Sequence, residues 1–446
     1  MVTATSTVAD ICRSAKRAAK QLARVDTATK DAALEAIAAA LQARSEEIVQ
    51  ANGRDMSAGH EADIGDALLD RLRLDEGRIA AIAGAVRQIA ALGDPVGEVI
   101  DGHRLANGLD VRKVRVPLGV IAVVYEARPN VTIDATALCL KSGNAIVLRG
   151  SSSATHSNAV LAQIASEAAV GAGLPEGCVS LVAGGGREEL AELATQEESV
   201  DLIIPRGGEG LKAALKEVAS VPVIYAASGN CHVYVDATAD TEQAERIVLN
   251  AKTQRPGVCN AAETVLVHRR AASEIVPALI VALVEAGVSI RGDEQTLARA
   301  ERLAKRFASG NASHGVPADV EFAQQISDAV GPASEEDWAS EYLALTIAVR
   351  VVDSTEEAIE HIGRYGSGHS EAIVTRDTAS ARAFQLGVDA ACVYVNASTR
   401  FTDGGEFGMG AEIGNSTQKL HARGPIGLRE LCTFKYLVEG DGHVRD

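Results

Sequence analysis

The sequence predicts an α/β protein with two doubly wound parallel-sheet domains, and three observations lead to this fold class. Short β-branched runs alternate with helical stretches from residue 119 to 226, which is the pattern of a parallel sheet with crossover helices. The same cycle starts again at Thr241, so a second domain is expected beyond a boundary near residue 240. Residues 6–93 are instead Ala-rich with apolar residues at the helical period, and these helices should cover one face of a domain.

The elements of the first sheet follow in order from residue 111. Alternating valines and basic residues over 111–116 predict a solvated strand, and the β-branched run Gly119–Tyr125 predicts a strand buried on both faces. The remaining strands of this domain are expected at 145–148, 179–182, 202–204 and 223–226. The helices between them are expected at 132–141, 157–170, 190–194 and 209–218.

The second domain is expected to begin with a helix at 241–251, a strand at 263–268 and a helix at 273–286. Residues 293–336 are polar and mixed, and no element is assigned to them. The later strands are expected at 345–351, 372–375, 393–396 and, after a Gly-rich segment, 433–438.

Composition narrows the classes of function. The formal net charge of -17 disfavours nucleic acid and anionic membranes as partners, although an anionic small molecule could still bind a locally basic pocket. The 7 cysteines are an odd number with no CxxC pair, so neither a disulfide framework nor a metal site is expected, and free thiols indicate a reducing cytoplasm. The N-terminus lacks the pattern of a signal peptide, and the sequence has no apolar run long enough to span a membrane.

Cys259 is the strongest candidate for chemistry. The Pro-Gly pair just before it breaks the preceding helix and leaves the cysteine in a loop, where its side chain can face a cleft. Lys252 and Arg255 are close in sequence, and cations favour the thiolate, which is the nucleophilic form. The alternative is a buried, inert thiol, which is the more common state of an isolated cysteine. The neighbouring Cys231 and His232 should point to opposite faces of a strand and are not expected to act as a dyad.

Two turns at strand ends are candidates for cofactor binding. In the first, glycines between a buried strand and a helix would let backbone N–H groups approach a phosphate at the helix N-terminus. Its residues are Pro205, Arg206, Gly207 and Gly208. In the second, Arg149 is followed by hydroxyl residues from Ser151 onward, which suits a 2′-phosphate, whereas Asp or Glu would chelate a ribose diol. The alternatives are an ordinary tight turn and a solvated arginine.

Four strings in this order resemble the aldehyde dehydrogenase superfamily and, within it, the gamma-glutamyl phosphate reductase (glutamate-5-semialdehyde dehydrogenase) family. They are residues 125–132, 204–208, 255–261 and 412–425. The resemblance spans nearly the whole chain and implies three parts. The implied parts are a cofactor-binding domain (1–107 and 118–240), a catalytic domain (241–420) and a small β oligomerisation arm (108–117 and 421–446).

The resemblance also implies roles for single residues. Cys259 would be the nucleophile, and Asn130 resembles an oxyanion-binding asparagine, with a plain turn asparagine as the alternative. Glu341 would contact the nicotinamide ribose of NADPH, and Arg149 takes the place of the superfamily's cofactor lysine. The expected substrate-binding residues are Arg255, as a clamp for a phosphate or carboxylate, and Asn260. Segments 396–403 and 412–417 are further candidates for holding the substrate's amino and carboxylate groups.

One departure from the superfamily is informative. Hydrolytic aldehyde dehydrogenases carry a Glu-Leu-Gly-Gly segment whose Glu activates water, and here the corresponding stretch, 227–230, begins with Ala. A missing general base disfavours release by water and suits exchange of a thioester with phosphate. The expected reaction is therefore NADPH-dependent reduction of L-glutamyl 5-phosphate to L-glutamate 5-semialdehyde and phosphate in proline biosynthesis.

Three other classes of function are alternatives to this reaction. A CoA-acylating aldehyde dehydrogenase also lacks the hydrolytic base, but it should respond to CoA and ignore phosphate. A non-catalytic scaffold should have lost the cysteine or the Gly-rich turns, and both are present. A nucleic-acid-binding protein is disfavoured by the acidic charge. The expected assembly is a homo-oligomer, either a dimer or a tetramer, with glutamate 5-kinase as a candidate partner.

Overall fold

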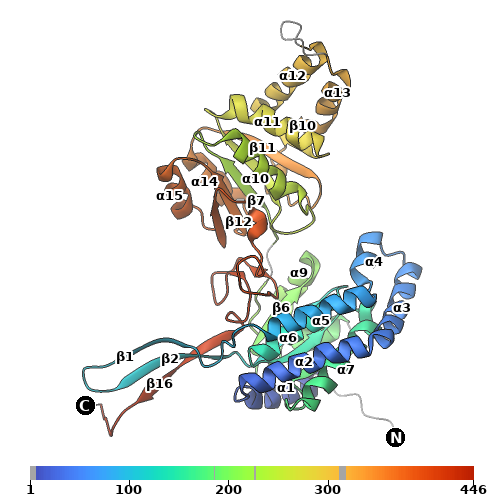
Figure 1. The fold of residues 1–446 in the computed structure, drawn as a ribbon, viewed down its shortest axis with the longest axis vertical. Coiled ribbons are helices and arrows are strands. Elements are labelled where there is room, and N and C mark those ends of the chain that lie inside the picture. Colours follow the sequence, from blue (N-terminus) through green and yellow to red (C-terminus); the bar gives the residue numbers. More distant parts are fainter. Residues whose placement is uncertain (1–6, 185, 226–227, 311–317, 446) are drawn as a thin grey trace. The chain divides into compact units, whose positions relative to one another are not determined.

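The computed structural model describes residues 7–184, 186–225, 228–310 and 318–445. The chain divides into two compact units (Figure 1). The first comprises Met1–Ala226, Gly408–Gly414 and Leu420–Asp446, and the second comprises Ala227–Phe407 and Asn415–Lys419. The sequence places the boundary near residue 240, whereas β7 (Cys231–Val235) lies in the second unit because it hydrogen-bonds to strands β8 and β12 of that unit.

Five helices precede the first strand, as the Ala-rich pattern predicted. They are α1 (Val8–Leu22), α2 (Thr27–Ala43), α3 (Ser45–Glu61), α4 (Asp66–Leu72) and α5 (Glu76–Ala90). Side chains cap three of their N-termini: Thr7, Asp26 and Asp75 each accept a backbone N–H of the first turn. The apolar faces of α1, α2 and α5 pack into the same core cluster as the first sheet.

The first parallel sheet has the strand order β5-β4-β3-β6. Its strands confirm four predictions: β3 (Val120–Tyr125), β4 (Ala145–Arg149), β5 (Val179–Leu181) and β6 (Leu202–Arg206). Its helices confirm four more: α6 (Asn130–Lys141), α7 (Thr155–Gly171), α8 (Arg187–Ala194) and α9 (Glu209–Val218). The predicted strand at 223–226 is wrong for its described residues, because Val223 forms only an isolated bridge to Ile203. Pro222 lacks the N–H that a longer ladder would need.

The second parallel sheet has the order β10-β9-β11-β8-β7-β12-β13. It confirms the predicted strands as β8 (Ala262–His268), β11 (Thr346–Val352), β12 (Ser370–Val374) and β13 (Cys392–Val395). It is covered by α10 (Thr241–Thr253), α11 (Ala272–Glu285), α14 (Thr355–Tyr365) and α15 (Thr378–Gly387). The sequence did not predict α14 and α15, nor four further elements of this unit: β9 (Ser289–Gly292), α12 (Glu294–Ser309), α13 (Val320–Ala329) and β10 (Val330–Pro332).

A small antiparallel sheet belongs to the first unit and runs away from its helices (Figure 1). Its order is β1-β2-β16, with β1 (Val99–Arg104), β2 (Asp110–Pro117) and β16 (Cys432–Glu439). The pairing of β2 with β16 brings together the two segments that the sequence assigned to an arm, and β1 was not predicted. Several apolar side chains of β16 are exposed, including Tyr436 at 60%.

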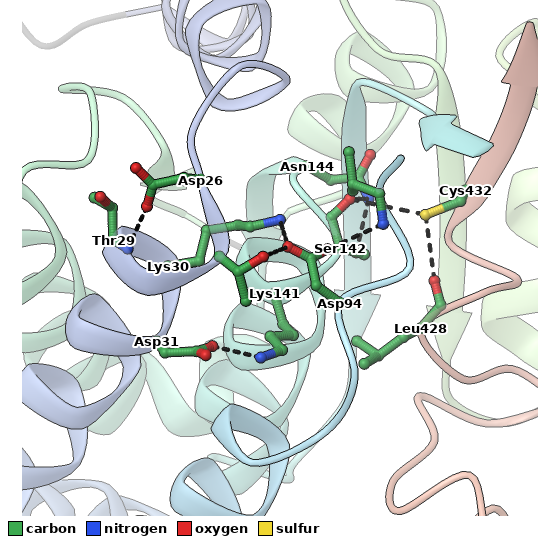
Figure 2. Close-up of polar contacts among 12 residues, drawn as sticks. Asp26, Thr29, Lys30, Asp31, Asp94, Lys141, Ser142, Asn144, Leu428 and Cys432 are labelled. Atoms are coloured by element: carbon green, nitrogen blue, oxygen red, sulfur yellow. Dashed lines mark hydrogen bonds and ion pairs between the residues drawn. The ribbon is translucent and has the colours of Figure 1, made fainter. Parts of the chain in front are cut away.

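Buried polar contacts hold the helices of the first unit to one another and to the segments that enter this sheet (Figure 2). The Nζ of Lys30 lies 2.5 Å from a carboxylate oxygen of Asp94, and the Lys30 side chain has no exposure. Lys141, equally buried, pairs with Asp31. Asn144 donates its amide to the carbonyl of Leu431 at 2.8 Å, immediately before β16, so the base of the arm is anchored to the loop after α6.

Two properties of the described residues bear on function. No group of three His, Cys, Asp or Glu side chains in this part of the chain is arranged to hold a metal ion. No helix within the same residues is long and apolar enough to cross a membrane.

Candidate active site

Cys259 lies in the loop between α10 and β8, as the Pro-Gly pair predicted. All 7 cysteines are described and none forms a disulfide, and Cys259 is the one that is not buried. A tight turn holds the loop, since the N–H of Ala261 donates to the carbonyl of Val258 at 3.0 Å. Accessibility separates this thiol from the inert, buried state of the other six.

The backbone of Cys259 is held by Gly229 and Cys231, which lie near the start of the second unit. A Cβ built on Gly229 would lie 1.5 Å from the carbonyl oxygen of Cys259, so only glycine fits there. The Sγ of Cys231 lies 3.2 Å from the same oxygen and donates to it. Ala227, the position that the resemblance aligns with the base of hydrolytic aldehyde dehydrogenases, lies outside the described residues. The stretch just after it runs along the backbone of the cysteine.

Glu341 reaches this segment from another part of the second unit. Its Oε1 accepts the N–H of Gly229 at 2.7 Å. The structure therefore links Glu341, which the resemblance assigned to the cofactor, to the backbone that packs on Cys259. The contact between Gly229 and Glu341 could not be predicted from sequence, because the two residues are 112 positions apart.

Lys252 is not available to act as the cation that the sequence suggested for the thiol. Its side chain is fully buried, and its Nζ lies 2.5 Å from Oε2 of Glu263, which is also fully buried. Burial lowers the pKa of Lys252, and the Glu263 carboxylate opposes that change. Burial likewise raises the pKa of Glu263 to about 7, against the effect of Lys252. The charge of Lys252 is thus compensated by Glu263.

The cations near the cysteine loop are Arg255 and Arg400. Arg400 lies in the short helix η4 (Thr399–Phe401), and its Nε donates to Oε1 of Gln254 at 2.8 Å. Burial lowers the pKa of Arg400, the charge of Arg255 lowers it further, and the charge of Cys259 acts in the opposite direction. Arg400 belongs to the segment 396–403 that the sequence named for substrate, but its place beside the cysteine loop was not predicted.

Asn260 ties the same short helix to the loop. Its Nδ2 donates to the carbonyls of Arg400 at 3.3 Å and Thr402 at 3.0 Å. Its own carbonyl accepts the hydroxyl of Thr399 at 2.7 Å. The amide donors of Asn260 are thus occupied by the protein, which makes the residue a support for the loop in this structure.

Asn130 belongs to the first unit, where it starts α6. Its Nδ2 donates to Oδ2 of Asp134 at 2.9 Å, one helical turn later. Burial raises the pKa of Asp134 to about 6, while the hydrogen bond from Asn130 acts in the opposite direction. The carboxyl of Asp134 fixes the direction in which the Asn130 amide faces.

Arg149 and Ser151 follow β4 in the first unit. Arg149 is 7% exposed, and its Nη2 donates to the carbonyl of Gly186 at 2.5 Å. Burial lowers its pKa, while the charge of Glu189 opposes the shift. The Oγ of Ser151 accepts the N–H of Ser153 at 3.2 Å. Arg149 is therefore more enclosed than the solvated arginine that was the alternative.

The glycine turn after β6 lies at the start of α9, as predicted. Pro205 is buried within the strand and Arg206 ends it. The N–H of Gly208 donates to Oε2 of Glu126 at 3.1 Å, and a Cβ on Gly207 would lie 2.7 Å from Cδ of the same glutamate. This turn thus already binds one anionic group, a carboxylate of the chain itself.

Comparisons with known proteins agree with this arrangement. The model of the aldehyde dehydrogenase family matches residues 2–298. Gamma-glutamyl phosphate reductase of Moorella thermoacetica is 53% identical over 97% of this chain and 97% of its own length. That of Thermobifida fusca is 51% identical over 98% of each. The crystal structure of gamma-glutamyl phosphate reductase from Thermotoga maritima is 43% identical, with a TM-score of 0.90, and covers 99% of this chain and 100% of that one.

Proposed function

The chain belongs to the gamma-glutamyl phosphate reductases of the aldehyde dehydrogenase family, and on that premise we propose that it reduces L-glutamyl 5-phosphate with NADPH. The products are L-glutamate 5-semialdehyde and phosphate. The observation that carries the proposal is the accessible Cys259, whose carbonyl lies against Gly229, two residues after the position that the resemblance aligns with the hydrolytic base. Seven cysteines without a disulfide suit a reducing compartment, and we place the reaction in the cytoplasm.

The residues of the first unit fit a dinucleotide cofactor. The N–H of Gly208 at the start of α9 already donates to a carboxylate, so it can donate to a phosphate oxygen. The residues of this unit that would hold the cofactor are Arg149, Ser151, Pro205, Arg206, Gly207 and Gly208. For Glu341 we retain the contact with the nicotinamide ribose that the resemblance implies. When bound, NADPH supplies the hydride that reduces the acyl group. The choice of NADPH over NADH rests on Arg149 with its neighbouring serines.

The chemistry of the chain begins at the sulfur of Cys259. The thiolate attacks the acyl carbon of the substrate, the carbon–oxygen bond to phosphate breaks, and a thioester remains on Cys259. We assign the backbone N–H of Cys259 as a donor to the developing oxyanion. Gly229 and Cys231 support the loop from the other peptide, through the carbonyl of Cys259. For Asn130 we retain the role of second oxyanion donor that the resemblance implies. After reduction, the carbon–sulfur bond breaks and the thiolate is restored.

Arg255 and Arg400 suit the anionic ends of the substrate. The two like charges influence each other beside the cysteine loop, and an anion between them would relieve their repulsion. L-Glutamyl 5-phosphate carries a carboxylate and a phosphate, and guanidinium groups bind both through paired hydrogen bonds. We assign the pair to one of these groups.

The arm is proposed to assemble a homo-oligomer. Strand β16 is the edge of its sheet, and its exposed apolar side chains are of the kind that a second copy would cover. The residues are Phe434, Tyr436, Leu437 and Val438.

The test is the reverse reaction, the NADP-linked oxidation of glutamate 5-semialdehyde with and without phosphate. Wild-type protein should need phosphate, and Cys259→Ala should lose turnover by at least about a thousandfold, the scale of removing a catalytic nucleophile. Cys178→Ala, which removes a buried thiol of the first unit, serves as the matched control. Wild-type turnover in Cys259→Ala would refute the covalent route. Activity that requires CoA in place of phosphate would favour the acylating alternative.

A further inference from the structure

A buried ion pair brackets the loop that carries Cys259. Lys252 lies near the end of α10 and Glu263 near the start of β8, so the loop leaves from one residue and returns to the other. Their charged atoms are 2.5 Å apart, and both side chains are fully buried. Removing two charges from water costs free energy that offsets much of their mutual attraction. Well-packed apolar residues at the same positions often give a protein equal stability. Stability alone therefore does not explain the pair.

The second oxygen of Glu263 binds a different segment. Its Oε1 accepts the N–H of Leu343 at 3.4 Å. Leu343 has a φ of 54°, in the left-handed region that non-glycine residues rarely adopt. Such a conformation persists where its surroundings impose it, and Glu263 supplies one such contact. Lys252 lies near the same segment, with its Nζ 5.9 Å from the ring centroid of Tyr342.

This second segment leads back to the cysteine by two routes. Glu341, two residues before Leu343, accepts the N–H of Gly229, which packs on the carbonyl of Cys259. The carbonyl of Leu343 also lies 3.7 Å from the position of a Cβ built on Gly257, within the cysteine loop. The ion pair thus connects the loop that carries Cys259 with the segment that carries Glu341. Neither Lys252 nor Glu263 needs to contact the thiol to do so.

We propose that Lys252 and Glu263 are positioning residues, which hold the Cys259 loop and the Glu341–Leu343 segment in one mutual geometry. The pair sets how the thiol is presented to the acyl carbon and where the carboxylate of Glu341 stands. This inference rests on the proposed function, in which Cys259 is the nucleophile. It assigns a role in the reaction to a charge pair that touches neither substrate nor cofactor.

The test replaces both charges with apolar groups of similar volume, Lys252→Met together with Glu263→Met. No unpaired charge is left buried, so the thermal midpoint should stay at or above that of the wild type. The kcat of the reverse reaction should fall about 100-fold, because misplacing a reacting group by about 1 Å has that effect. The KM for the semialdehyde should stay within about threefold, since no substrate contact is removed.

A second readout does not depend on turnover. The rate at which iodoacetamide alkylates Cys259 should change at least about fivefold in the double variant, because the surroundings of the thiol change. The matched control is Lys305→Met with Glu301→Met, an exposed pair of the same unit, which should behave as wild type. A folded Lys252→Met/Glu263→Met protein with wild-type kcat and alkylation rate would overturn the proposal.

Two outcomes are kept apart by this design. If the wild type itself fails to oxidise the semialdehyde, the proposed function is wrong, while the alkylation comparison still tests positioning. If the double variant does not fold, Lys252→Gln together with Glu263→Gln decides, because it also leaves no unpaired charge buried. It keeps the size of the Glu263 side chain and an acceptor for the N–H of Leu343, but it removes both charges. Its kcat should fall about tenfold, and an unchanged kcat and alkylation rate would overturn the proposal.

Discussion

Gly229→Ala is the smallest change that tests how the thiol is held. The added Cβ would lie 1.5 Å from the carbonyl oxygen of Cys259, whereas real Cβ atoms essentially never approach a heavy atom closer than 3.0 Å. The two backbones must therefore separate by about 1.5 Å. That movement also strains the 2.7 Å bond between the N–H of Gly229 and Glu341.

The expected effect on catalysis is much larger than the effect on stability. Overpacking of this kind costs about 1–3 kcal/mol, which a domain with the usual 5–15 kcal/mol of stability tolerates. A shift of about 1.5 Å at the nucleophile exceeds the displacement of about 1 Å that can reduce turnover 100-fold. We therefore expect kcat of the reverse reaction to fall at least about 100-fold in a protein that still folds.

The assay is NADP-linked oxidation of glutamate 5-semialdehyde in the presence of phosphate, with thermal unfolding recorded on the same samples. The matched control is Gly257→Ala, in the cysteine loop itself, where the added Cβ meets only the carbonyl of Leu343 at 3.7 Å, an ordinary contact. The control should keep turnover within about threefold of the wild type. If folded Gly229→Ala matches the control, the segment after residue 227 does not position the cysteine.

Four further predictions follow from other parts of the chain. Arg149→Met should raise the KM for NADPH by about tenfold or more and leave the KM for NADH nearly unchanged, as steady-state kinetics with both cofactors would test; a wild type that prefers NADH contradicts this role. Arg400→Met should raise the KM for the semialdehyde about 10-fold or more with little effect on the KM for NADP, since it removes a charged hydrogen bond worth about 1.5–3 kcal/mol; equal effects on both would count against a substrate contact. Burial lowers the pKa of His369 to about 4, so the histidine stays neutral in the folded chain and gains its proton on unfolding. The contribution of neutral His369 to the free energy of unfolding is fully present above pH 6.5. It is lost as pH falls from 6.5 toward 4, by up to about 1.4 kcal/mol per pH unit. Urea unfolding at pH 7.5 and pH 5 should therefore show a weaker pH dependence for His369→Gln than for the wild type. Tyr436→Asp should shift sedimentation toward smaller species, whereas an unchanged assembly would place the interface elsewhere.

The order of strands and helices could be predicted because buried parallel strands and amphipathic helices leave different periods in the sequence. The elements between residues 289 and 332 show where this fails. Strands β9 and β10 have only 4 and 3 residues, too few to show a period. Helix α12 is rich in charged residues and buries few of its own, so its composition resembled a polar loop. These elements owe their form to the sheet and core against which they pack.

The site shows a similar limit, and Lys252 is its clearest example. Proximity in sequence suggested that this lysine would act on Cys259, because a cation near a thiol favours the thiolate. A lysine that is fully buried must find a partner charge, and Glu263 is that partner. The cation that interacts with the charge of Cys259 is instead Arg400, which lies 141 positions further along the chain. Hydrogen bonds of η4 to Gln254 and Asn260 hold it beside the cysteine loop.

This division of roles follows from burial. Lys252 and Glu263, at the end of α10 and the start of β8, lie within the core, where pairing with each other is the least costly arrangement. A cation that is to meet an anionic substrate must keep some exposure, as Arg255 in the loop and Arg400 in a separate segment do. By this reasoning, exchanging Arg400 for Lys should preserve more substrate affinity than moving a positive charge to any position within α10.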